Sequence, residues 1–297
     1  MIVPGTPECG GCYWCVRGRA DQCAHLFVGQ PQVATRASGE PLTSSGGGGT
    51  YAELMRVPSS WIFPIETDLP DDTLSLFGCG VTTGLGAVFN AAKVEAGSSV
   101  AVVGCGHLGL WMVQGARVAG AERVIAVEPN PERRGLAATL GATHLVDPVD
   151  GDSIEQVREL TGGRGPDYVL EAAGNADAQN EAIVMSRKAG TVVLTGLATF
   201  GTVVSVNQVD LALRGRTIQS CQNGMSRMGR DIPRYAKMLE DGVVDARPII
   251  TAHYELADIN DALAQSEAHR DLSGVIVPAH SGSGLPARPA LSRPERS

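Results

Sequence analysis

The sequence predicts an α/β fold built on a doubly wound parallel sheet, and three features of the chain carry this prediction. A short apolar run at residues 100–103 is followed by a glycine-rich turn and a helical stretch over 110–119. A second apolar run at 124–127 ends on Glu128. Apolar runs and helical patterns then alternate as far as residue 221. Such alternation places parallel strands in one sheet with helices on both faces.

The glycine-rich turn reads GCGHLG at residues 104–109 and has the residue types that a dinucleotide phosphate site requires. Gly104 permits the tight turn, and Gly106 has no Cβ, so that backbone can approach a pyrophosphate. Gly109 lets the following helix pack close to its strand. The strand, turn, helix, strand and acid together match the Rossmann fingerprint, whereas the alternative is a glycine turn in some other α/β sheet.

Glu128 completes this fingerprint, because a carboxylate about 20 residues beyond the turn can accept hydrogen bonds from the adenosine ribose. The 2′-phosphate of NADP would meet a like charge there, and Pro129 and Asn130 are not basic, so the sequence predicts NAD. The free N–H groups and positive end of the helix would face the phosphates. We therefore expect the backbone amides of His107 and Leu108 to matter more than their side chains.

Composition and charge exclude several classes of protein. The net charge of −8 and an aromatic content of 4% argue against a nucleic-acid binder. Residues 96–116 are apolar enough to suggest a membrane span, but Ser98, Ser99, His107 and Gln114 interrupt them, and a strand–turn–helix unit explains them better. The N-terminus, MIVPGTPECGG, lacks a basic region followed by an apolar core, so we expect a cytoplasmic protein with no membrane partner.

Four of the seven cysteines crowd into the first 23 residues with the spacing C-x2-C-x2-C-x7-C: Cys9, Cys12, Cys15 and Cys23. In a reducing compartment this spacing favours metal binding over disulfides or free thiols. Four thiolates at tetrahedral positions close a zinc ion completely and leave no position for substrate. The sequence therefore predicts a structural zinc that holds a loop with little core of its own.

The remaining helices and strands are predicted from the periodicity of apolar residues and from residues that typically start or end such elements. After Glu128 we expect helices over 131–140, 153–161 and 175–187, strands over 144–146, 167–171, 190–195 and 216–221, then helix 228–241, strand 249–254, helix 257–267 and strand 273–277. Before the turn we expect a loop over 36–50, a strand from Thr50 to Val57, a helix start within Asp68–Asp72 and a helix over Cys79–Ala92. The tail, 279–297, is rich in Pro, Ser and Arg, and we expect it to be disordered.

Three segments in order resemble the zinc-dependent medium-chain alcohol dehydrogenases: the cysteine cluster, GCGVTTGLGA at 78–87 and VAVVGCGHLG at 100–109. The likeness continues to the last predicted strand. It implies a GroES-like catalytic domain, here partial, split around a Rossmann domain, with residues 1–80 and 222–278 in the catalytic part and 81–221 in the cofactor part. It also implies hydride transfer between an alcohol and an aldehyde or ketone with NAD(H), and a homodimer or homotetramer paired through a strand near 216–221.

The resemblance also implies roles for individual residues. Cys79 matches the last ligand of the family's catalytic zinc, and Thr83 matches a threonine that packs against the nicotinamide. Arg133 matches a basic position at the adenosine ribose. Main-chain contacts to the nicotinamide are implied for Thr195, Gly196 and Leu197. The plainer alternatives are a buried thiol for Cys79, helix packing for Thr83 and a solvated helix face for Arg133.

The sequence departs from the family pattern before the cysteine cluster. The family's other catalytic ligands, a first cysteine and a Gly-His-Glu segment, lie upstream of this cluster, and only eight residues precede Cys9 here. His25, Cys105 and His107 exist as substitutes, but no spacing favours them. Three functions therefore stay open: an alcohol dehydrogenase with impaired activity, a thiol-adduct formaldehyde dehydrogenase of the same family, or a non-catalytic NAD-binding protein with a structural zinc.

Overall fold

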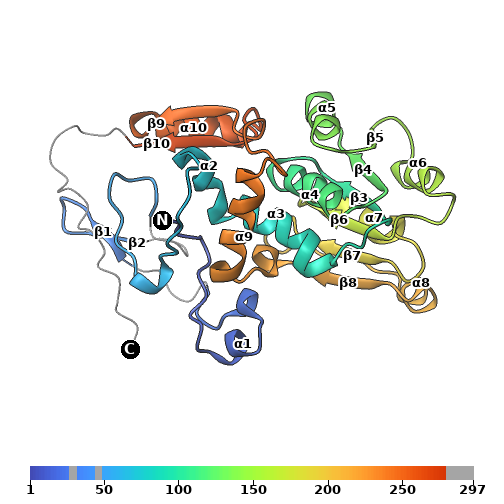
Figure 1. Cartoon of the computed structure of the whole chain (residues 1–297), viewed down its shortest axis with the longest axis horizontal. Coiled ribbons are helices and arrows are strands. Elements are labelled where there is room, and N and C mark those ends of the chain that lie inside the picture. The colour runs from blue at the N-terminus through green and yellow to red at the C-terminus, as the bar shows by residue number, and fades with distance from the viewer. Residues whose placement is uncertain (27–31, 44–48, 279–297) are drawn as a thin grey trace.

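The computed structural model of the chain describes residues 1–26, 32–43 and 49–278. A six-stranded sheet with its helices occupies one end of the molecule, and segments from both ends of the chain meet at the other (Figure 1). The prediction of disorder for 279–297 lies outside the described residues. The α/β class predicted from the sequence is confirmed.

The sheet is parallel throughout and has the strand order β5-β4-β3-β6-β7-β8. Its strands are β3 (Ser99–Val103), β4 (Arg123–Val127), β5 (His144–Val146), β6 (Tyr168–Glu171), β7 (Thr191–Leu194) and β8 (Thr217–Ser220). Each was predicted to within one or two residues. The order reverses between β3 and β6, so the carboxyl ends of these two strands form the switch point at which ligands bind in open α/β sheets.

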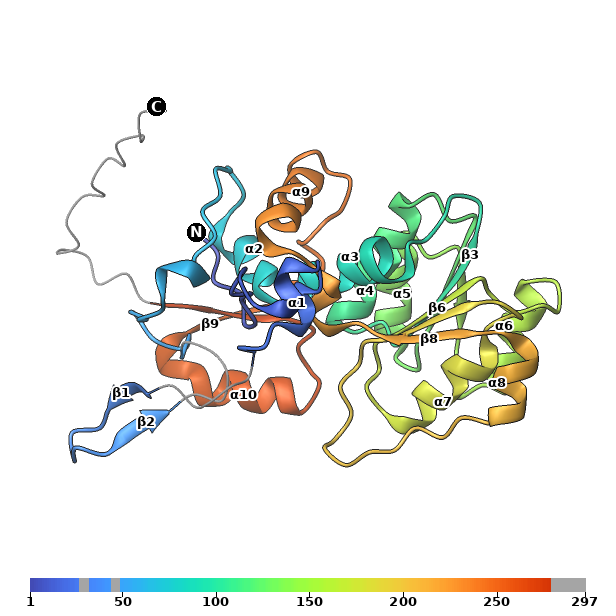
Figure 2. The same ribbon diagram turned by 90° about the horizontal axis from the view of Figure 1, so that it is seen from below.

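Alternate residues of β3 face two separate cores. Val100 and Val102 pack with the helices on one face, whereas Ala101 and Val103 pack with those on the other. The covering helices lie on opposite sides of the sheet in Figure 2: α4 (His107–Val118) and α5 (Pro131–Thr139), against α6 (Ser153–Leu160) and α7 (Ala176–Met185). Burial on both faces explains why these strands read as continuous apolar runs without alternation.

The helix starts differ in how they are capped. Helices α5, α6 and α7, together with α8 (Gln208–Arg214), begin after Asn130, Asp152, Asn175 and Asn207, whose side chains accept from backbone N–H groups. Helix α4 instead begins after Gly106, with no capping side chain. Its first N–H groups have no intrahelical acceptor and stay available to a ligand. Helix α8 was not predicted, because its apolar residues Val209 and Leu213 are exposed and form no buried stripe.

A helical segment that bends at Cys79 precedes the sheet. It comprises α2 (Asp71–Ser75), a 3-10 turn (Leu76–Gly78), α3 (Gly80–Gly86) and a π-helical stretch (Ala87–Ala92). The predicted helix start within Asp68–Asp72 and the predicted helix over Cys79–Ala92 are both confirmed. The segment ends at Lys93, which adopts a left-handed conformation with φ 53°.

The chain returns after β8 through a 3-10 turn and α9 (Met228–Glu240). A small βαβ unit follows, in which β9 (Ala252–Glu255) and β10 (Gly274–Val277) are parallel and α10 (Ile259–Glu267) connects them. The predicted strand over 249–254 starts later than expected. The N–H groups of Ile249 and Ile250 bond back to the carbonyl of Ala246, so these residues form a turn.

The N-terminal part agrees least with the predictions. It contains α1 (Tyr13–Val16) and an antiparallel pair, β1 (Gln32–Thr35) and β2 (Pro41–Thr43), so the predicted loop over 36–50 is wrong where β2 lies. The predicted strand from Thr50 to Val57 is also wrong, because these residues form bends and coil. Leu54 is 77% exposed and has no partner face to pack against, so its apolar alternation does not produce a strand.

No single helix among the described residues is long and apolar enough to cross a membrane. The bent pair Asp71–Gly78 and Gly80–Ala92, broken at 59°, passes the same test of length and composition. The apolar stretch at 96–116 is divided between β3 and α4, as predicted.

Candidate functional site

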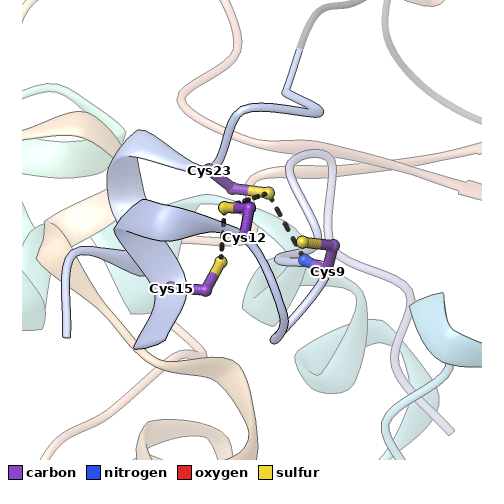
Figure 3. A group of neighbouring side chains, drawn as sticks. All are labelled: Cys9, Cys12, Cys15 and Cys23. Carbon is purple, nitrogen blue, oxygen red and sulfur yellow. Dashed lines mark hydrogen bonds between the residues drawn. The ribbon is translucent and has the colours of Figure 1, made fainter. Parts of the chain in front are cut away.

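The four clustered cysteines converge in the N-terminal lobe (Figure 3). Their Sγ atoms all lie within 4.8 Å of one another, with Cys12 Sγ 3.5 Å from that of Cys15 and 3.9 Å from that of Cys23. A tetrahedral zinc with Zn–S bonds of about 2.3 Å places its sulfurs about 3.8 Å apart. The donor set therefore fits a four-thiolate zinc.

Backbone N–H groups already point at these sulfurs. The N–H of Cys9 donates to Cys23 Sγ and that of Ala24 to Cys12 Sγ, each at 3.4 Å. The Ala24 donor lowers the pKa of the Cys12 thiol to about 6, whereas desolvation and the neighbouring Cys12 thiol raise the pKa of Cys15 to about 12. A bound cation is what allows all four sulfurs to be ionised together.

The cysteine lobe is anchored to the start of α9. Glu8 Oε1 accepts from the N–H of Met228 at 2.9 Å, and burial raises the pKa of this carboxyl. Gly18 lies directly against Arg227, because a Cβ added at Gly18 would be 2.1 Å from a guanidinium nitrogen. The position of the lobe therefore depends on contacts with the start of α9 as well as on its own thiols.

The glycine turn has the shape expected of a phosphate cradle. Gly104 has φ +87°, and a Cβ there would lie 2.8 Å from the nitrogen of Ala173. A Cβ at Gly109 would lie 1.9 Å from the carbonyl oxygen of Gly104, so α4 could not pack here with a larger residue. Beside Gly106 a Cβ would meet nothing within 4 Å, so open space adjoins the uncapped N-terminus of α4. These residues fit the pyrophosphate of a dinucleotide.

Glu128 is only 4% exposed and is tied to the same turn. Its Oε2 accepts from the N–H of Cys105 at 2.7 Å, and its Oε1 accepts from that of Asn130 at 2.9 Å. Sequence reasoning assigned it only a contact to the ribose. The Arg133 guanidinium donates to the carbonyl of His269 at 3.0 Å, and its contact with the ribose stays a prediction.

The side chain of His107 has a structural environment that sequence reasoning missed. Its Nδ1 contacts Ser273 Oγ, next to β10, and its Nε2 lies against Gly80 at the start of α3. Burial lowers the pKa of this imidazole to about 4, so the ring is neutral near pH 7. Leu108, the next residue, packs its side chain against the main core.

Cys79 and His107 line one cleft of about 390 Å³ between α3 and the start of β10. Its other lining residues are Tyr51, Ser75, Leu76, Gly80, Ser266 and residues 271–275. The Cys79 side chain is exposed, so the alternative of a buried apolar thiol is wrong. Its Sγ lies 3.8 Å from Thr83 Oγ1, and Thr83 donates to Asn223 Oδ1 at 3.2 Å.

A catalytic zinc does not fit this cleft with the described residues alone. Three protein ligands are needed, and the cysteine lobe is the one described group in which three or more ligand side chains converge. His25 is exposed, and Cys105 is buried beneath the phosphate turn. His107 lines the same cleft as Cys79, but no group of three ligand side chains forms there among the described residues, so the ligand set of a catalytic zinc is incomplete.

Residues 195–197 follow β7 at the carboxyl edge of the sheet. The N–H groups of Thr195 and Gly196 donate to the carbonyl of Glu171 at 3.0 and 3.2 Å, and the Leu197 side chain is 90% exposed. Glu171 itself was missed by sequence reasoning. The available signal was a carboxylate at the end of an otherwise apolar strand. Burial raises the pKa of this carboxyl, and backbone donors partly oppose the shift.

Comparison with known proteins gives consistent matches. The family described as "Zinc-binding dehydrogenase" matches residues 108–241. An S-(hydroxymethyl)glutathione dehydrogenase of Synechocystis sp. is 34% identical over 280 residues, covering 91% of this chain and 76% of the relative. One from Paracoccus denitrificans is 30% identical over 287 residues, covering 92% and 76%.

Solved structures agree with these relatives. An alcohol dehydrogenase zinc-binding domain protein from Burkholderia ambifaria superposes with a TM-score of 0.87 at 31% identity, covering 93% of this chain and 76% of that one. Benzyl alcohol dehydrogenase from Acinetobacter calcoaceticus gives 0.85 at 26%, covering 94% and 77%. A zinc-binding dehydrogenase from Sinorhizobium meliloti, solved bound to NADP, gives 0.76 at 26%, covering 91% and 74%.

Proposed function

Because the chain belongs to the zinc-binding medium-chain dehydrogenase family, an oxidoreductase family, we propose that its site transfers a hydride between an alcohol and an aldehyde or ketone with NAD(H). The observation that carries this proposal is the uncapped start of α4, which lies at the switch point of the sheet, while His107 of the same turn lines the cleft with Cys79. This arrangement supports the proposal because the turn suited to a dinucleotide phosphate and the exposed Cys79 thiol adjoin one cleft.

Residues of the chain have distinct tasks in this proposal. The N–H groups at the start of α4 bind the pyrophosphate, and the Glu128 carboxylate holds the turn that presents them. Thr83 and residues 195–197 flank the nicotinamide, whereas Cys79 would be one ligand of a catalytic zinc only if two further protein ligands joined it. The nicotinamide supplies the hydride acceptor or donor when NAD(H) is bound. Neutral His107 lines the cleft and joins the turn to Ser273, next to β10.

A second candidate substrate class is favoured by the curated relatives. Both relatives described above are named S-(hydroxymethyl)glutathione dehydrogenase, at 30% and 34% identity. This supports the thiol-adduct alternative, in which the alcohol is the hydroxymethyl adduct of a thiol. The two candidates are separated by comparing simple alcohols with S-(hydroxymethyl)glutathione as substrates of the same preparation.

Titration with reduced cofactors tests the cofactor proposal. We expect NADH to bind more tightly than NADPH, because the 2′-phosphate of NADPH would approach the Glu128 carboxylate. The Glu128→Ala variant should bind both cofactors more weakly, since Cys105 N–H loses its acceptor, but the ratio of the two dissociation constants should shrink. Fluorescence of the bound reduced nicotinamide measures both constants. Equal affinities in the wild type, or tighter NADPH, would contradict the preference.

We also predict a dimer or tetramer. Strand β8 is an edge of the sheet, and exposed apolar side chains lie on the loop and helix before it: Leu197, Phe200, Val203, Val209 and Leu213. An exposed edge with apolar neighbours invites pairing with a second copy. Light scattering at micromolar concentration should give at least twice the chain mass. The Phe200→Asp variant should lower the measured mass towards that of a monomer. The control variant Val149→Asp should leave the mass unchanged, because Val149 is 81% exposed but lies near the other edge of the sheet. A monomeric wild type would overturn the prediction.

A further inference from the structure

Glu171, at the end of β6, has a completely buried carboxylate, and the donors that hydrogen-bond to it are neutral amides. Its Oε1 accepts from the N–H of Gly174 at 2.6 Å, and its Oε2 accepts from the N–H of Gly196 at 3.2 Å. The amide of Gln179 donates to the same Oε2 at 3.4 Å and to the carbonyl of Gly196 at 2.9 Å. A buried carboxylate is costly unless such donors satisfy it.

The two backbone donors, Gly174 and Gly196, come from two loops at the carboxyl edge of the sheet, and Gln179 lies on α7. One loop, residues 172–175, follows β6, and the other, residues 195–197, follows β7. The loops touch without room for larger residues, because a Cβ at Gly196 would lie 2.3 Å from the nitrogen of Gly174. A Cβ at Gly174 would lie 2.8 Å from the carbonyl oxygen of Leu197. Glu171 is therefore the shared acceptor that joins the two loops.

The phosphate turn, by contrast, has its own supports. The N–H of Gly104 donates to the carbonyl of Val127 at 2.8 Å, and the N–H of Cys105 donates to Glu128 at 2.7 Å. The carboxyl edge of the sheet thus has two buried carboxylates, Glu128 and Glu171, and each is bonded to different loops. Glu128 holds the turn on the β4 side of the switch point, and Glu171 holds the loops on the β7 side.

We propose that Glu171 is a positioning residue for the nicotinamide half of the cofactor, acting through the main chain of residues 174 and 196–197. The proposal rests on the proposed dinucleotide function. A dinucleotide whose pyrophosphate lies at α4 spans the switch point, so its two halves extend over the loops on either side. The loops joined by Glu171 then shape the side that receives the nicotinamide, while the adenosine side depends on Glu128.

The Glu171→Gln variant tests this in the full-length chain with two ligands, NADH and ADP-ribose, which lacks the nicotinamide. Glutamine has the same shape but turns an NH2 group towards one of the backbone donors, so the loops lose part of their shared acceptor. We expect the dissociation constant for NADH to rise at least about tenfold, which is about 1.4 kcal/mol, and that for ADP-ribose to change less than about twofold. Fluorescence titration measures NADH, and calorimetry measures ADP-ribose.

The matched control is Glu181→Gln on α7, because Glu181 is half-buried and accepts from Ser153 Oγ at 2.9 Å, away from the groove. It should leave both dissociation constants unchanged. If Glu171→Gln fails to fold by circular dichroism, Gln179→Met decides. Methionine has a similar side-chain volume but cannot donate to the carbonyl of Gly196. This variant should weaken the binding of NADH and leave the binding of ADP-ribose unchanged.

If Glu171→Gln weakens the binding of NADH and of ADP-ribose equally, or weakens neither, the proposal is overturned. A carboxylate with only a structural role would not affect one ligand more than the other. A wild type that binds ADP-ribose as tightly as NADH overturns it as well, while dinucleotide binding stands. A wild type that binds neither ligand overturns the proposed function and this inference with it.

Discussion

The 297-residue chain is expected to bind NADH yet to oxidise alcohols about a thousandfold more slowly than the Synechocystis relative assayed in parallel. Cofactor binding needs the turn at 104–109 and Glu128, which the structure provides. Hydride transfer in this family also needs a Lewis acid held by three protein ligands, and no group of three ligand side chains among the described residues includes Cys79. Losing that ion should cost about 4 kcal/mol of transition-state stabilisation.

The measurement is NADH formation across primary, secondary and aromatic alcohols and S-(hydroxymethyl)glutathione, with zinc content determined on the same preparation. We expect one zinc per chain. The Cys79→Ala variant should change neither the zinc content nor the residual rate, and its NADH affinity serves as the control for folding. Turnover at the rate of the relative with one bound zinc would show that the chemistry does not need the second metal. Loss of a second zinc on Cys79→Ala would show that Cys79 has ligand partners after all.

The Cys12→Ala variant is expected to lose nearly all of the roughly one zinc per chain that the four thiolates hold. Cys12 Sγ lies within hydrogen-bonding distance of two other sulfurs and receives the Ala24 N–H, so its removal opens the site at its centre. Binding energy of a structural zinc is folding energy, so residues 5–26 should lose hydrogen-exchange protection, while the sheet of 99–220 keeps it.

Cys221→Ala is the matched control, because Cys221 is buried outside the lobe and should leave the zinc content unchanged. Elemental analysis gives the stoichiometry, and exchange measured by mass spectrometry locates the loosened residues. A wild type that contains no zinc and has freely titrating thiols would refute the metal assignment. Retention of zinc in Cys12→Ala would refute the ligand set.

The sequence by itself determined the sheet, the glycine turn and the cysteine cluster. Each of these shows in a local pattern of residues: apolar runs that alternate with helical stretches, the spacing of the glycines, and the spacing of the cysteines. Strands β3 and β4 are paired neighbours joined by one helix, Gly104 supplies a left-handed φ that other residues rarely adopt, and the thiols of residues 9–23 are near enough to meet around one ion. Local spacing is sufficient evidence for such features.

Tertiary structure alone decided the rest. The contact of His107 with Ser273 joins residues 166 positions apart, and the partners of Glu171 lie on two loops that only strand pairing brings together. The apolar alternation of Thr50–Val57 predicted a strand, but no neighbouring strand pairs with it among the described residues, so it stays irregular. A strand and a buried carboxylate both require partners distant in the chain, and a single sequence does not identify which residues those partners are.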